Sequence, residues 1–212
     1  MLLAVAVLAG LLAACGSDDD GSADETASSA NAAFLRAMIP HHESAIEMAK
    51  LAVANGEHPQ VRQLASNIVR TQGREIRRIR RIYRLLFGVP VKPNAGAHMQ
   101  LGLSADAAGM SHGDMAELEG AKPFDKAFID AMVPHHQGAI RMARAVKLKS
   151  EDVEIGRLAD GIIQAQATEI SDMNSWRESW YGARSPAGGV PKDAGADALP
   201  PEDQDSGEHM GH

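Results

Sequence analysis

The sequence predicts an all-α protein, a four-helix bundle made of two copies of one helical hairpin. One segment of the 212-residue chain recurs further along at a constant spacing. Each copy has the apolar periodicity of two amphipathic helices separated by a short loop. Aromatic residues make up only 4% of the chain, whereas strands are enriched in aromatic residues. Together these observations favour helices over a β-sandwich.

The repeat is the strongest signal in the sequence. Phe34–Lys50 and Phe128–Arg144 are identical at ten of seventeen positions, at an offset of 94 residues. The same offset aligns Val61–Ile79 with Ile155–Met173 without a gap. Because the register is kept across the intervening loop, the whole hairpin is duplicated rather than a single helix.

The N-terminus is predicted to be an export signal followed by a lipid anchor. Residues 1–14 are almost wholly apolar but shorter than the roughly 20 residues that a membrane-spanning helix needs, so they are typical of a signal peptide. Leu12–Cys15 resembles a bacterial lipobox, which predicts a lipidated Cys15, a flexible tether over 15–30 and attachment to the outer face of the cell membrane. No Lys or Arg precedes the apolar run, a departure that a translation start upstream of Met1 would explain. The alternative is an ordinary secretory signal with a chance cysteine.

Cysteine count and charge exclude several classes of protein. Cys15 is the only cysteine, so the mature chain has no internal disulfide and no thiolate metal site. The formal net charge of -7 argues against nucleic acid as the main partner.

The first hairpin is predicted over 31–88, with helices at 31–54 and 59–87. Asn55-Gly56 ends the first helix, because Asn and Gly suit the left-handed conformation after a helix C-terminus. The second helix carries a stripe of arginines spaced by three or four residues, opposite its apolar face. We expect a solvated face, with weak contact to anionic lipid headgroups as the alternative. The stripe consists of Arg70, Arg74, Arg77, Arg81 and Arg84.

The second hairpin is predicted over 123–182, with helices at 123–148 and 150–181. A linker over 89–122 joins the hairpins and contains a possible short helix at 114–119. The tail over 183–212 is rich in Pro, Gly and Asp and is predicted to be disordered. Linker and tail also carry soft metal ligands that could capture an ion loosely or have no role. These are His98, Met99, Met110, His112, Met115, His209, Met210 and His212.

Methionine and histidine share one face of the first helix in each hairpin. The helical period places them together, and the second helix of each hairpin adds polar residues on its apolar face. In the first hairpin the set is Met38, His41, His42, Met48, Gln72 and Glu75; in the second it is Met132, His135, His136, Met142, Gln166, Glu169 and Met173.

These residues predict either a metal site or a buried structural network. A carboxylate facing a core is costly unless it is paired or bound to a metal, and the nearest partners are the histidines of the facing helix. His–Glu pairs could equally specify helix register. Pro40 and Pro134 precede the histidines and could kink the helix or mark its start.

Ligand softness predicts copper if a metal is bound. Thioether and imidazole together suit copper, whereas zinc has little use for methionine. Calcium and magnesium need an oxygen-rich site. Di-iron bundles use Glu-x-x-His motifs, and neither hairpin contains one.

The motif Met-Ile-Pro-His-His-x-x-Ala-Ile-x-Met-Ala, followed by Gln-x-x-Glu-Ile, resembles the domain of unknown function 305 (DUF305) family. The resemblance covers about 31–181 and occurs twice. It implies an exported protein with a ferritin-like four-helix bundle, and some members are implicated in copper binding and tolerance. It therefore implies copper ligands at Met38, His41, His42, Met48, Glu75, Met132, His135, His136, Met142, Glu169 and Met173. Ile79 stands where the second repeat has Met173, so the first site would be weaker or differently coordinated.

The sequence thus predicts an extracytoplasmic copper-binding lipoprotein that buffers or scavenges the metal. The alternative is a structural or interaction module of the cell envelope whose His–Glu pairs only specify packing. An oxidase is disfavoured, and we expect no enzymatic activity. The protein partner, the metal stoichiometry and whether the repeats form one site or two stay open.

Overall fold

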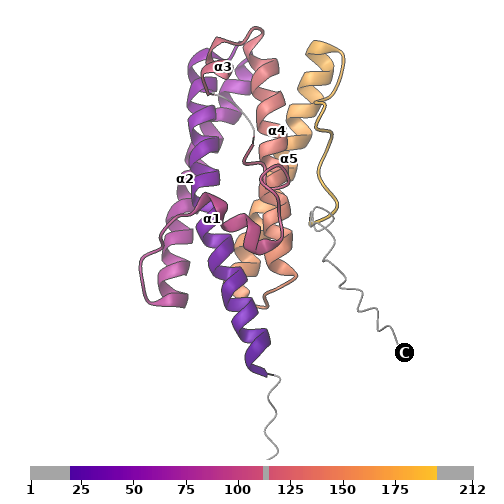
Figure 1. Cartoon of the computed structure of the whole chain (residues 1–212). Coiled ribbons are helices and arrows are strands. Elements are labelled where there is room, and N and C mark those ends of the chain that lie inside the picture. Colours follow the sequence, from indigo (N-terminus) through magenta and orange to yellow (C-terminus); the bar gives the residue numbers. More distant parts are fainter. Residues whose placement is uncertain (1–19, 112–114, 195–212) are drawn as a thin grey trace, which may run out of the picture.

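Four long helices form the bundle, as Figure 1 shows, and the prediction of an all-α bundle is confirmed. The computed structural model describes residues 20–111 and 115–194, and within these ranges there is no strand. The predicted signal peptide, Cys15, His112 and the ligands of the far tail lie outside the described residues. The elements are α1 (Asp20–Asn55), α2 (Pro59–Phe87), η1 (Ala95–Leu101), α3 (Met115–Gly120), α4 (Phe124–Lys147) and α5 (Val153–Tyr181). None of the helices in the described part of the chain combines the length and apolarity that crossing a bilayer requires.

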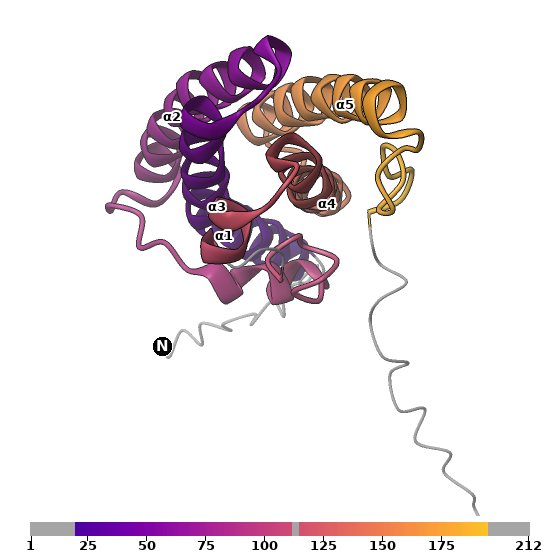
Figure 2. The same ribbon diagram turned by 90° about the horizontal axis from the view of Figure 1, so that it is seen from above.

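The two hairpins pack through their histidine-bearing helices. Within each hairpin, α1 packs on α2 and α4 packs on α5, and α1 also packs on α4. Figure 2, a view along the bundle, shows the α1–α2 hairpin beside the α4–α5 hairpin. The helices that carry the repeated histidines are therefore the ones that join the hairpins.

The second helix of each hairpin begins and ends at equivalent positions of the repeat. Gly88 and Gly182, equivalent positions in the two hairpins, both adopt left-handed backbone angles, with φ of 70° and 81°, and end α2 and α5. At the start of α5 the Asp152 side chain accepts hydrogen bonds from the backbone N–H groups of Glu154 and Ile155. Such a cap satisfies donors that a helix N-terminus otherwise leaves free.

The core divides into two apolar clusters. One includes Phe34 and Ile79, and the other includes Ile68 and Phe128. On every long helix the stretch between the clusters carries polar residues, so a polar layer crosses the middle of the bundle. We call this set the histidine layer: His41 and His42 of α1, Gln72 and Glu75 of α2, His135 and His136 of α4, and Gln166 and Glu169 of α5.

The predicted flexible tether over 15–30 is wrong from Asp20 onward. Helix α1 begins at Asp20 and continues without interruption to Asn55. Alanine-rich sequence favours a helix, and acidic residues such as Glu25 suit the positive end of its dipole. Pro40 and Pro134 lie inside α1 and α4, so neither marks a helix start.

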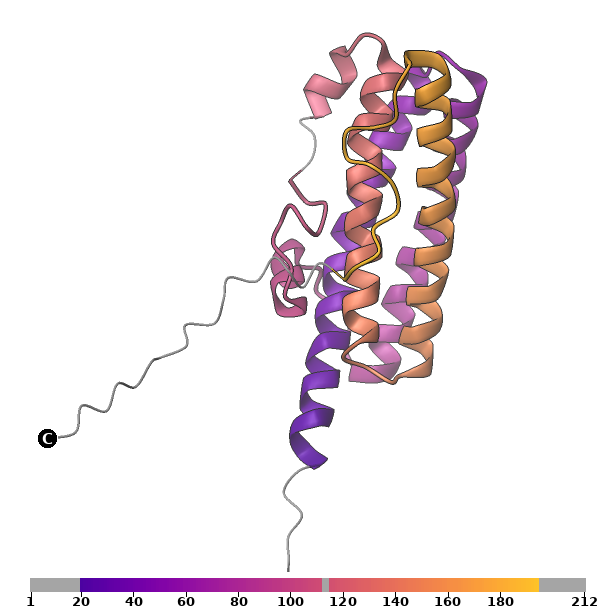
Figure 3. The ribbon, with the colours of Figure 1, turned by 90° about the vertical axis from the view of Figure 1, so that its right-hand side faces the viewer.

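The predicted disordered tail is also wrong for 183–194. Figure 3 shows this segment running back along α4 and α5. The Gln137 side chain donates to the carbonyls of Ala187 and Gly189, and Arg177 donates to the carbonyl of Ala183. Side-chain donors on the helices thus hold the backbone of the segment, and Val190 and Ala194 also pack against the apolar clusters.

The linker and the arginine stripe largely follow expectation. The short helix predicted at 114–119 is present as α3, whereas η1 was not predicted. The five arginines of the stripe are all exposed, which agrees with a solvated face; contact with lipid headgroups stays a prediction.

Candidate metal centre

Each hairpin makes one histidine–glutamate hydrogen bond in the histidine layer. His42 Nε2 lies 2.7 Å from Glu75 Oε2, and His136 Nε2 lies 2.6 Å from Glu169 Oε2. These four residues occupy equivalent positions in the repeat, so the duplication preserves the pair. The predicted pairing between a core-facing carboxylate and a histidine of the facing helix is therefore present twice.

The other two histidines join the hairpins. The ring centroids of His41 and His135 are 3.8 Å apart, and these residues are counterparts in the repeat. Within each helix the neighbouring histidine rings are 6.3 and 6.4 Å apart. The four imidazoles thus form one continuous group, and the two constellations of the sequence merge at the centre of the bundle.

Burial controls the electrostatics of this group. The four histidines are at most 2% exposed, whereas the side chains of Glu75 and Glu169 are 25% and 16% exposed. Burial lowers the pKa of His41 well below its ordinary value of 6.5, and His42 and His136 act in the same direction. The backbone of Ala108 and of His135 opposes this shift without cancelling it. His41 is therefore a neutral imidazole at pH 7.

Buried polar atoms without hydrogen-bond partners concentrate in the layer. Neither ring nitrogen of His41 makes a hydrogen bond of ordinary geometry, and the Nδ1 atoms of His42 and His136 make none within the described chain. The side-chain amides of Gln72 and Gln166 are in the same situation. Such atoms are costly in a core, and their gathering in one layer fits a site for a bound ion.

Methionines lie on both apolar sides of the layer. All five that the sequence predicted as ligands are at most 1% exposed. Met38 and Met142, one from each hairpin, belong to the first apolar cluster. Met48, Met132 and Met173 belong to the second. Met173, which stands where the first repeat has Ile79, is therefore the third thioether on the side of the second cluster. The difference between the repeats distinguishes the two sides of the layer, whereas the sequence predicted a difference between the sites of the two hairpins.

Distance along the helix separates the methionines into two groups. Met38 and Met132 precede His41 and His135 by three residues, about one helical turn. Met48 and Met142 follow the second histidine of each pair by six residues, roughly 9 Å along the helix axis. We therefore expect Met38 and Met132 to be the closer thioether ligands.

The linker covers the layer on one side, which sequence reasoning missed. A Cβ atom at Gly138 would lie 2.2 Å from the carbonyl carbon and oxygen of Ala108. A Cβ at Gly109, where φ is +67°, would lie 2.9 Å from the carbonyl oxygens of Pro134 and His135. Two glycines thus let the linker backbone press directly on α4 beside the histidines. Glycine in a helix interior was the signal that could have revealed this contact.

Soft ligands in the described part of the linker serve packing. His98 Nδ1 lies 2.8 Å from the Leu103 carbonyl oxygen, which fixes the turn after η1. Met110 packs against the first apolar cluster and Met115 against the second, while Met99 is exposed. Metal capture by these residues stays a prediction.

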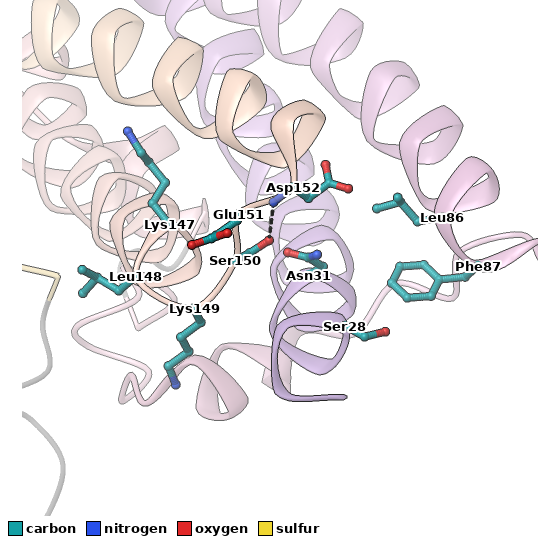
Figure 4. Close-up of a pocket in the computed structure, with 10 residues that line it drawn as sticks. All are labelled: Ser28, Asn31, Leu86, Phe87, Lys147, Leu148, Lys149, Ser150, Glu151 and Asp152. Atoms are coloured by element: carbon teal, nitrogen blue, oxygen red, sulfur yellow. Dashed lines mark hydrogen bonds between the residues drawn. The ribbon is translucent and has the colours of Figure 1, made fainter. Parts of the chain in front are cut away.

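Two further observations limit the kind of site. Among the residues that the structure describes, no three His, Cys, Asp or Glu side chains gather as a metal site on their own. A surface cavity of 680 Å³ lies elsewhere, lined by the start of α1, the end of α2 and the α4–α5 loop, as Figure 4 shows. It contains none of the predicted ligands. A centre in the histidine layer would instead be enclosed, because its four histidines are at most 2% exposed. It would also need thioether or amide donors, because no three described His, Cys, Asp or Glu side chains suffice.

The fold and the layer define a helical-bundle protein with a buried centre of His, Met and Glu. The chain belongs to the family described as Domain of unknown function (DUF305), whose profile matches residues 31–177 and 146–211. The resemblance stated from the motif is thereby confirmed.

Solved structures show the same fold. CopM in its Cu(I)-bound form is 38% identical, with a TM-score of 0.61 over 72% of this chain and 98% of that chain. CopM has also been solved in Cu(II)-bound and Ag-bound forms. A DUF305 protein from Streptomyces coelicolor is 26% identical, with a TM-score of 0.62 over 75% of this chain and 98% of that chain.

A curated relative matches only part of the chain. An uncharacterized protein of Acanthamoeba polyphaga mimivirus is 41% identical over 51 residues, 24% of this chain. The chain spans about a third, 34%, of the length of that protein.

Proposed function

We propose that this chain binds copper in the histidine layer and buffers or scavenges the metal outside the cytoplasm. The observation that carries the proposal is the merging of four buried imidazoles from both hairpins into one group, with thioethers on both sides. The proposal assigns no catalytic step to the layer.

Hydrogen bonding selects the nitrogen that would bind the metal. An ionised carboxylate can only accept a hydrogen bond, so Nε2 of His42 donates to Glu75 and Nε2 of His136 donates to Glu169. The lone pair then resides on Nδ1, which has no partner in either residue within the described chain. Glu75 and Glu169 would thus orient the imidazoles and raise their basicity, as carboxylates behind metal-bound histidines do.

Copper fits these donors better than other metals. The chain has no thiolate for the centre, and imidazole with thioether suits copper in both common oxidation states. The relative CopM has been solved with Cu(I), Cu(II) and Ag. This likeness supports a soft, monovalent-capable site in the present chain.

A copper titration tests the proposal. Purified protein is titrated with Cu(I) and Cu(II) under controlled redox conditions, and bound ions are counted beside a variant with His41, His42, His135 and His136 changed to Ala. The matched control is His58→Gln, outside the layer, and circular dichroism checks folding. We expect the four-histidine variant to lose the tightest ions; ions that it retains belong to the tail or linker. Full retention by a folded variant would exclude the histidine layer as the copper site.

The lipid anchor is a separate part of the proposal. The support is the sequence Leu12–Cys15 behind an apolar leader, and the DUF305 relative from Streptomyces coelicolor is described as a putative secreted protein. Labelling cells with a fatty-acid analogue should mark the parent chain but not Cys15→Ser, which should leave the membrane fraction. Equal labelling of both chains would exclude Cys15 as the acylated residue.

A structural role is the second candidate, because each glutamate already has a histidine partner. This reading predicts a bundle whose melting temperature does not respond to copper. It also predicts that Glu75→Ala and Glu169→Ala are strongly destabilising. A copper-dependent rise in melting temperature that the four-histidine variant lacks would favour the metal site.

A further inference from the structure

Two buried glutamine amides in the histidine layer have no role in the site so far. Gln72 and Gln166 are 3% and 2% exposed. Neither the amide nitrogen nor the amide oxygen of either residue has a hydrogen-bond partner among the described residues. A buried amide without partners costs free energy that a leucine at the same position would not.

Other glutamines of the described chain behave differently. Gln137 is similarly buried, at 6% exposed, but its amide nitrogen donates to the carbonyls of Ala187 and Gly189. Gln63 is exposed, and its amide nitrogen lies 3.4 Å from Asn67 Oδ1. Among the buried glutamines of the described chain, missing partners are therefore specific to the two of the layer, and the repeat preserves this feature in both hairpins.

Position along the helix places both amides inside the layer. On α2, Gln72 lies between Ile68 of one apolar cluster and Ile76 of the other. On α5, Gln166 lies in the same way between Ile162 and Ile170. Their side chains are thus enclosed between the clusters, further from solvent than the partly exposed glutamates.

The donor atoms of a copper site decide which oxidation state it prefers. Thioethers select Cu(I), whereas Cu(II) favours nitrogen and oxygen donors. Oε2 of Glu75 and Oε2 of Glu169 already accept from histidine, and both glutamate side chains are partly exposed. The amide oxygens of the two glutamines are, by contrast, fully buried and have no hydrogen-bond partner among the described residues.

We propose that the side-chain carbonyls of Gln72 and Gln166 are the oxygen donors with which the histidine layer holds Cu(II). This inference rests on the copper site proposed above. It assigns histidine and thioether to Cu(I), and histidine and amide oxygen to Cu(II), within one layer.

A double variant, Gln72→Leu with Gln166→Leu, tests the inference in the full chain. Affinities are measured separately for Cu(I) under anaerobic conditions and for Cu(II), and the Cu(II) spectrum is recorded by electron paramagnetic resonance. We expect at least a tenfold loss of Cu(II) affinity and a Cu(I) affinity within threefold of the parent. A tenfold fall in the ratio of Cu(II) affinity to Cu(I) affinity raises the one-electron reduction potential of the bound copper by about 59 mV. Gln63→Leu, an exposed glutamine of α2, is the matched control.

The metal-free protein gives a second readout. Removing two unpartnered amides should raise the melting temperature of the metal-free chain, whereas glutamines that merely held the bundle together would lower it when removed. If the leucine variant does not fold, Gln72→Met with Gln166→Met keeps the side-chain length and replaces oxygen with thioether. This variant should lose Cu(II) affinity and gain Cu(I) affinity.

The outcomes separate this inference from the proposed function. Glutamine variants whose Cu(II) affinity and spectrum match the parent would overturn the oxygen-donor role while leaving the histidine site intact. A parent chain that holds no copper in the histidine layer would overturn both proposals. Loss of affinity for both oxidation states alike would also contradict the inference, because it would show a general role in shaping the layer.

Discussion

The contact between the linker and α4 makes a sharp prediction for Gly138→Ala. The new Cβ would lie 2.2 Å from the carbonyl carbon and oxygen of Ala108 and 2.4 Å from the backbone nitrogen of Gly109. These are backbone atoms, so no side-chain rotation relieves the overlap. The linker must move away from α4 or the helix must shift, and both disturb the cover over His135.

The expected loss of stability follows from two opposing effects. Forcing extra volume into a well-packed region costs about 1–3 kcal/mol, and rigid backbone neighbours favour the upper end. Replacing a helical glycine by alanine stabilises the helix by up to about 1 kcal/mol. The net loss of about 2 kcal/mol should lower the melting temperature by roughly 4–8 °C for a chain of this size.

Gly161→Ala is the matched control. Gly161 is exposed in the middle of α5, and a Cβ there would meet nothing within 4 Å. The same substitution should therefore stabilise the protein by up to about 1 kcal/mol. Differential scanning calorimetry of both variants should show shifts of opposite sign. If Gly138→Ala melts at or above the parent temperature, the linker does not press on α4 as the structure has it.

Three further predictions concern the histidine layer. Glu169→Ala leaves the buried His136 N–H without its acceptor, so chemical denaturation should show a loss of about 1–3 kcal/mol in the free energy of unfolding. Copper affinity should fall about 10–100-fold. Unchanged values for both would contradict the pairing. Because the folded pKa of His41 lies below 6.5, the unfolded chain binds the extra proton first, and metal-free stability should fall as the pH drops below about 6.5. A His41→Asn variant should lose part of that slope. Met173→Ile, which copies Ile79 of the first hairpin, should lower Cu(I) affinity with little effect on Cu(II), as measured by competition with a Cu(I) chelator.

The bundle could be predicted from sequence because the repeat carries tertiary information. A duplicated amphipathic hairpin buries its apolar faces most simply against its own copy. The ends of the helices were predictable where glycine adopts left-handed angles, as at Gly88 and Gly182. The packing within each hairpin was also predictable, because the repeat keeps its register across the loop and both hairpins must then pack alike.

Within the candidate site, the sequence indicated the candidate ligands but not the contacts between them. His41 and His42 are adjacent, so periodicity could not show that His42 meets Glu75 while His41 meets His135. That division depends on how two hairpins pack against each other, which no local pattern describes. The merging of both constellations into one layer follows from the same packing.

The linker and the segment after α5 were beyond prediction for a different reason. The composition of the tail indicated disorder, and no repeat or long amphipathic period showed that the linker residues Ala97, Leu101, Leu103 and Ala108 join the first apolar cluster. The structure orders them through contacts of backbone with side chain, such as Gln137 on the Ala187 carbonyl, and through backbone pressed on backbone at Gly138. Such contacts depend on the helix surface opposite and leave little trace in the segment itself.

The cost of the histidine layer is itself an argument for a ligand. A bundle that needed only stability would fill its centre with apolar side chains, because replacing buried polar groups by packed apolar ones is often neutral or stabilising. This bundle instead places four imidazoles and two unpartnered amides between two apolar clusters, with two imidazoles and one amide from each copy of the repeat. Each unpartnered polar group costs about 1–3 kcal/mol, so the layer opposes folding of the metal-free chain. An ion that satisfies these donors at once would recover that free energy, so the proposed copper site would couple metal binding to the stability of the bundle.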